Sequence, residues 1–109
     1  MVGRDPAHEP ALAAALNSLA NRYATAGWRD EGLAVARKTV ELYRRLAANN
    51  PDAHLHSLAT TAHNLVTDLR KAGRPGEAHA LAREAERYYL ELGVTAPASL
   101  GPKTDGPGG

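Results

Sequence analysis

Two stretches of the chain decide its fold. They read LAAALNSLANRYATAGWRDEGLAVARKTVELYRRL at residues 12–46 and LATTAHNLVTDLRKAGRPGEAHALAREAERYYLEL at residues 58–92. A shift of 46 residues aligns them, and eleven of the 35 aligned positions are then identical, among them a Gly, a Glu and a Tyr. Self-similarity at a fixed period is the sequence signature of repeat architectures. The sequence therefore predicts one structural unit that occurs twice.

The first half of each copy has the apolar spacing of a helix. Its apolar side chains recur at steps of three and four, which places them along one face of a helix. They are Leu12, Leu16, Leu19, Tyr23 and Ala26 in the first copy and Leu55, Leu58, Ala62, Leu65, Leu69 and Ala72 in the second. We expect each of these helices to bury this stripe.

Glycines separate the two halves of each copy. Gly27 and Gly73 directly follow the stripes, where helices commonly end on a residue in the left-handed conformation. The second halves then begin near Asp30 and Pro75, and both acids and proline are favoured in the first turn of a helix. Asn50-Pro51-Asp52 is a further start signal. The sequence predicts an all-α fold of four antiparallel helices, at residues 10–26, 29–48, 51–72 and 75–92.

The composition fits one small helical domain. The 109 residues contain no Phe, one Met and one Trp, so Ala and Leu must form most of the core, which suits closely packed helices. We expect this domain at residues 10–93, with repeat one at 10–49 and repeat two at 50–93. Residues 1–9 and the segment 94–109, which is rich in Gly and Pro, are expected to be flexible.

Composition also excludes several classes of protein. Without Cys there is no disulfide scaffold, zinc knuckle or thiol catalysis, and a net charge of +1 argues against binding to the nucleic-acid backbone. No apolar run approaches the roughly 20 residues of a membrane span, and the N-terminus lacks the apolar stretch of a signal peptide. We expect a cytoplasmic protein without a nucleic-acid or membrane partner. The excess of Arg over Lys, ten to three, favours a bacterial source.

The stretches NSLANRYATAGWRDEGLAVA and HNLVTDLRKAGRPGEAHALA, residues 17–36 and 63–82, resemble the core of tetratricopeptide repeats. The matching marks are Leu19-Ala20, Tyr23, Gly27 and Glu31 in the first copy and Leu65-Val66, Leu69, Gly73 and Glu77-Ala78 in the second. The offset of 46 exceeds the 34 residues of the standard repeat and is similar to the longer repeats of kinesin light chains and bacterial regulatory proteins. Gly32 stands where the family prefers Ala, which we expect to weaken the second helix by about 0.5–1 kcal/mol.

This resemblance implies a binding groove. Tetratricopeptide repeat proteins bind peptides or partner helices in a concave groove lined by the first helix of each repeat. The corresponding residues are Asn17, Asn21, Ala24 and Thr25 in the first copy and Thr60, His63, Asn64, Thr67, Arg70 and Lys71 in the second. The Asn amides offer donors and acceptors to a backbone, and Arg70 and Lys71 offer cations to a carboxylate. The alternative is an ordinary solvated polar helix face.

The fourth helix has the features of an end piece, with one competing interpretation. His79 and Glu86 replace Leu33 and Val40 of the second helix, as the polar outer face of a terminal repeat requires. A second apolar stripe follows steps of four, three and four, and if it faces outward the domain is expected to form a homodimer to cover it. This stripe is Leu81, Ala85, Tyr88 and Leu92.

No motif indicates catalysis, a metal or a cofactor. His56 and His63 share a helix face, but seven helical rises separate them by about 10 Å, too far for one ion. There is no glycine-rich phosphate loop and no GxSxG nucleophile motif. Arg37 and Arg44, with their basic neighbours on the second helix, are interpreted as a solvated charged face.

The resemblance thus implies a non-catalytic module that binds a protein or peptide partner. Two alternatives remain open. One is a structural unit whose purpose is its own dimer, and the other is an accessory protein of a bacterial biosynthetic or regulatory system that holds a small ligand between its helix pairs. Trp28, at the first turn, can be core, groove edge or interface anchor.

Overall fold

The computed structural model describes residues 9–98 of the chain, and these form four helices. They are α1 (Glu9–Thr25), α2 (Arg29–Asn49), α3 (Pro51–Lys71) and α4 (Pro75–Leu92). Each predicted boundary agrees to within one residue, and no strand occurs in the described range, so the predicted all-α fold is confirmed. Almost all of the predicted N-terminal segment and most of the predicted tail, residues 1–8 and 99–109, lie outside the described residues.

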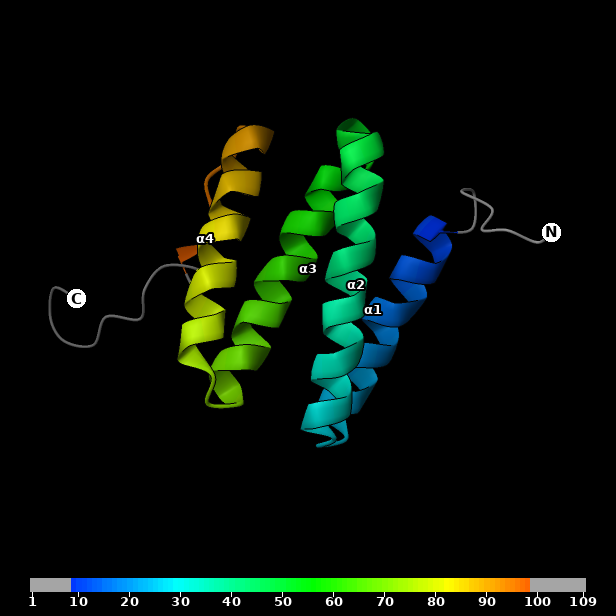
Figure 1. Ribbon diagram of the computed structural model, residues 1–109, viewed down its shortest axis with the longest axis vertical. Helices are drawn as coiled ribbons and strands as arrows, with labels where there is room; N and C mark the ends of the chain where they lie inside the picture. Colours follow the sequence, from blue (N-terminus) through cyan, green and yellow to red (C-terminus); the bar gives the residue numbers. More distant parts are fainter. Residues whose placement is uncertain (1–8, 99–109) are drawn as a thin grey trace, which may run out of the picture.

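The helices stand side by side in chain order (Figure 1). Within the described range, α2 packs against both α1 and α3, and α3 packs against both α2 and α4. The terminal helices α1 and α4 each have one major neighbour, α2 and α3 respectively. This is a row of stacked hairpins and not a closed bundle, because α1 and α4 lie at opposite edges.

The two hairpin turns have the same backbone structure. Gly27 and Gly73 take positive φ angles of 85° and 77°, which confirms the predicted left-handed helix ends. The Trp28 N–H donates to the Tyr23 carbonyl at 2.8 Å, and the Arg74 N–H donates to the matching carbonyl, that of Leu69, at 2.9 Å. These are the long-range bonds of the Schellman motif, which closes both turns in the same way.

Trp28 completes the first of these turns. Its ring stacks on Tyr23 with centroids 5.9 Å apart and planes inclined by 12°. A contact between these two positions commonly accompanies the Schellman motif. Trp28 is nevertheless 56% exposed, so it belongs to the surface and not to the core.

Gly32 brings α1 and α2 close together. A Cβ at residue 32 would lie 3.3 Å from the Tyr23 Cβ and 3.4 Å from the Ala20 carbonyl oxygen. Glycine was expected to weaken α2 here, but its missing side chain is what leaves room for this close approach.

The predicted stripe of α1 is only half correct. Its buried residues are Ala13 and Ala20, with Leu16 partly buried beside them, whereas Leu12 is 51% and Leu19 is 38% exposed. The reason is the position of α1 at the edge of the row. Its one major neighbour in the described range is α2, so only one side of its apolar face is covered.

The apolar stripe of α4 faces inward. Leu81 and Ala85 are buried, and Tyr88 and Leu92 are half-buried against the core. Self-association through this stripe was expected only if the stripe faces outward. It does not, because α4 packs this side against α3. The outer side of α4 instead exposes polar residues such as Glu86. No described helix is long and apolar enough to cross a membrane.

Candidate functional site

A cleft of about 170 Å³ lies between α1 and α3, at the end where the hairpins turn. Its lining residues are Ala24 of α1, Arg29, Gly32 and Leu33 of α2, and Asp68 and Lys71 of α3. Buried Leu33 is an apolar contact in this lining, and three charged side chains surround it. The cleft therefore combines an apolar contact with groups that can bind a polar or charged chain.

Asp68 and Arg29 are the charged residues of this cleft that the predicted groove residues did not include. Asp68 is half-buried, and this burial raises the pKa of its carboxyl above the usual value, while the charge of Lys71 acts in the opposite direction. The sequence did carry a signal, because Asp68 lies four residues after Asn64 and three before Lys71, on the same helical row.

The predicted groove residues of α3 fall on two neighbouring rows. Asn64 and Lys71 share the row of Asp68, and Lys71 itself lines the cleft. The second row lies about 100° round the helix. It contains His63, Thr67 and Arg70, all half-buried, and within it the Thr67 hydroxyl donates to the His63 carbonyl at 3.4 Å. Thr60 is exposed one turn before Asn64.

The predicted groove residues of α1 lead into the cleft. Asn17, Asn21 and Ala24 follow one another at steps of four and three, and Ala24 lines the cleft. Asn21 is exposed and Asn17 is half-buried. Thr25, by contrast, uses its hydroxyl locally and donates to the Asn21 carbonyl at 2.9 Å.

Comparison with known proteins now assigns the repeat. A model of the tetratricopeptide repeat matches residues 12–52 and again residues 58–91. The chain belongs to the tetratricopeptide repeat family. Tetratricopeptide repeats generally mediate protein–protein interactions. Neither a curated protein nor a solved structure matches the chain.

The opposite side of this tetratricopeptide repeat unit carries a second hollow, of about 330 Å³, between α2 and α4. It is lined by Arg37, Val40, Glu41, Arg44, Leu65, Leu69, Glu77, Ala80, Leu81 and Glu84. The apolar part of this lining comes from all three helices, whereas its charged residues belong to α2 and α4.

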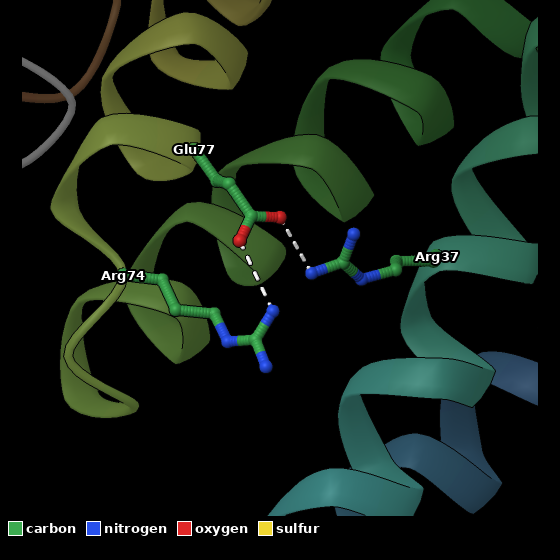
Figure 2. Close-up of polar contacts among 3 residues, drawn as sticks. All are labelled: Arg37, Arg74 and Glu77. Atoms are coloured by element: carbon green, nitrogen blue, oxygen red, sulfur yellow. Dashed lines mark hydrogen bonds and ion pairs between the residues drawn. The ribbon is translucent and has the colours of Figure 1, made fainter.

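Ion pairs join the two walls of this hollow. Arg37 of α2 reaches Glu77 of α4 at 2.7 Å, and Arg74 binds the other oxygen of the same carboxylate at 3.1 Å (Figure 2). Two turns further along, the guanidinium of Arg44 makes two hydrogen bonds of 2.8 Å to Glu84. Arg37 and Arg44 were predicted to form a solvated charged face; their side chains are 42% and 43% exposed, and they also connect one repeat to the next.

These contacts shift the acid–base properties of the wall. Hydrogen bonds from Arg37 and Arg74 hold the pKa of Glu77 below its usual value. Burial raises the pKa of Glu84, but hydrogen bonds from Arg44 and Tyr88 outweigh this effect and leave the pKa lowered. Burial and the bond to Glu84 raise the pKa of Tyr88 to about 12. Glu77 and Glu84 are therefore ionised at neutral pH.

The described residues offer no metal site. Within residues 9–98 no group of three or more His, Asp or Glu side chains lies close enough together to hold an ion.

Proposed function

We propose that this chain is a non-catalytic module that binds a peptide or helix of a partner protein in the cleft between α1 and α3. The observation that carries the proposal is the cleft itself, which lies between the first helices of the two repeats. Membership of a family whose repeats mediate protein interactions supports the same conclusion.

The charges of the cleft favour a partner with an acidic group. Arg29 and Lys71 outnumber Asp68, whose own carboxylate is partly desolvated. A carboxylate placed between the two cations would form charge-assisted hydrogen bonds, the stronger class of such bonds. The amides of Asn17 and Asn21, along the adjoining row of α1, can pair with the backbone of an extended segment or with side chains of a helix.

The test compares two variants that change the net charge equally. The partner is first captured from extracts of the native cells and identified by mass spectrometry. It is then titrated by calorimetry against the wild type, the double variant Asn21→Ala/Lys71→Glu, and Arg83→Glu on the exposed surface of α4. We expect the double variant to bind at least about tenfold more weakly, a loss of about 1.4 kcal/mol, and Arg83→Glu to bind as the wild type does.

Circular dichroism provides the folding control for this experiment. Asn21 and Lys71 are both exposed, so the double variant is expected to retain the wild-type helical signal. Undiminished affinity in a folded double variant would refute the assignment of the cleft.

A small-ligand function has less support. Ligand pockets usually enclose about 300–1,000 Å³, and the cleft between α1 and α3 is smaller. The hollow between α2 and α4, of about 330 Å³, reaches the lower end of this range, but the side chains of Arg37, Arg44, Glu77 and Glu84 in its lining are already paired with one another. A wider hollow of about 660 Å³ crosses the two hairpin turns and includes Trp28 and Arg74 but no histidine. Of its lining residues Ala72 is half-buried and the others are exposed, so it is a shallow surface and not an enclosed pocket.

A further inference from the structure

Within residues 9–98 no helix packs against the outer face of α1, and most of this face is apolar. Twelve consecutive residues, from Pro10 to Asn21, carry no charge. Among them Leu12 is 51% and Leu19 is 38% exposed, and Ala15 between them is exposed as well. The exposed surfaces of α2, α3 and α4 all contain charged residues. The exposed face of α1 is unusual within the described part of the molecule, because Arg22 is its one charged residue between residues 10 and 25.

The second repeat shows what this face lacks. Leu58 and Leu65 are the counterparts of Leu12 and Leu19 after a shift of 46 residues, and they are only 2% and 4% exposed. They are buried in the three-helix part of the row, where α3 has α2 on one side and α4 on the other. Leu65 lies beside Val40 of α2 in the hollow between α2 and α4. A helix packed on α1 as α2 packs on α3 would cover the exposed pair.

Charge decides which helix of this protein can fill that place. If a second copy stacked head to tail, its α4 would lie on α1 as α2 lies on α3. At the positions of buried Leu33 and Val40, however, α4 carries His79 and Glu86, both exposed. Placing a carboxylate and an imidazole against leucines would cost several kcal/mol without a polar partner. A head-to-tail filament is therefore disfavoured.

A second α1 meets the requirement. It offers Leu12 and Leu19, spaced by seven residues as Leu33 and Val40 are. Its one charged residue on this row, Arg22, lies one turn beyond Leu19, outside the segment between the two leucines. We propose that two copies of the chain associate through α1, in an antiparallel pair related by a two-fold axis. Leu12 of each copy then lies opposite Leu19 of the other, and the small side chain of Ala15 near the axis allows the helices to approach closely. Such a contact is closed, so it yields a dimer and no larger assembly.

This dimer does not depend on the proposed binding cleft. On α1, Asn17, Asn21 and Ala24 form a different row from Leu12, Ala15 and Leu19, and Ala24 is the residue that reaches the cleft. The interface comes from one 17-residue helix per copy, which is small for a specific complex. We expect dissociation in the micromolar range.

Sedimentation of the full chain from about 1 μM to about 1 mM provides the test. We expect a shift from monomer to dimer in the wild type and a monomer throughout in Leu12→Glu/Leu19→Glu. The matched control is Leu90→Glu, because Leu90 is 76% exposed on the outer side of α4, and it should dimerise as the wild type does. Both substituted leucines of α1 are exposed, and circular dichroism checks that the double variant remains folded.

Three results would overturn the proposal. The first is a wild type that stays monomeric at every concentration, which would leave the face of α1 to a helix of another protein. The second is a double variant that still dimerises. The third is a dimer that Leu90→Glu abolishes.

Cross-linking adds a readout that does not require the double variant to fold. The chain has no Cys, so single cysteines can be introduced without competing thiols. Mild oxidation of Ala15→Cys should give a disulfide-linked dimer, since the two Cβ atoms lie close to the axis. Leu90→Cys at the same concentration should not. Equal cross-linking of the two variants, or none in Ala15→Cys, would contradict the arrangement.

Discussion

The two repeats have the same turn but different surroundings. Gly27 and Gly73 close their hairpins with matching backbone hydrogen bonds, and the helices that meet at each turn end and begin at equivalent positions. Yet Leu19 is 38% exposed, whereas its equivalent Leu65 is only 4% exposed. The local sequence therefore determines the shape of each hairpin, whereas its neighbours in the row determine which of its side chains are buried.

The largest expected effect tests this difference at the paired leucines. Leu65→Ala should lower the free energy of unfolding by about 2–4 kcal/mol, because it leaves a cavity in the core. Leu19→Ala should cost less than about 1 kcal/mol, because much of that side chain is already in water. Urea denaturation at low micromolar concentration, where the proposed dimer is dissociated, measures both. Equal losses would show that the two helices are buried alike.

A smaller and more even effect is expected at the two turns. Gly27→Ala and Gly73→Ala each place a Cβ at positive φ, which should cost about 1 kcal/mol. A Cβ at either position meets no atom within 4 Å, so backbone strain is the whole cause and the two costs should match. Chemical denaturation of the two variants side by side is the measurement, and a clear inequality would mean that the turns are not equivalent.

The smallest effect concerns the ion pair of Arg44 and Glu84. Because this pair joins α2 of the first repeat to α4 of the second, it has no counterpart within either repeat. The pKa of Glu84 is lowered in the folded protein, so its contribution is present above the pKa of the unfolded state, about 4.5, and is lost as the pH falls through the folded value. Solvent screening limits this contribution to less than about 1 kcal/mol. Urea midpoints from pH 7 to pH 3 should fall less steeply for Glu84→Gln than for the wild type.

Glu91→Gln serves as the control for that titration, because Glu91 is an exposed acid on the same helix. It should follow the wild-type pH dependence. If Glu84→Gln also showed the wild-type pH dependence, the Arg44–Glu84 pair would not contribute to holding the repeats together.

The sequence predicts best what is decided locally. The glycines at 27 and 73 and the prolines at 51 and 75 mark the helix ends, because cap and turn preferences act over a few residues. It predicts less well what depends on distant neighbours. The exposure of Leu12 and the inward direction of Leu81 follow from which helix lies alongside, and the periodicity of a single helix does not contain that information.

The residues of the candidate site were likewise predicted only in part. The family resemblance led to Ala24 and Lys71, both of which line the cleft. It missed Asp68, which was not on the family's list of groove positions, and Arg29, which comes from the start of α2. It also gave no sign that Arg37 and Arg44 have carboxylate partners 40 residues away. Pairing across helices is a property of the assembled row.

The Arg37 and Arg44 bridges have a mechanical consequence. They join α2 to α4 through side chains, although these two helices have no extensive backbone contact. Two ion pairs thus hold α2 and α4 together across the hollow between them. The strength of these ion pairs falls with added salt. Added salt is therefore expected to weaken the side-chain connection between α2 and α4, while the apolar packing of both helices on α3 and its neighbours remains.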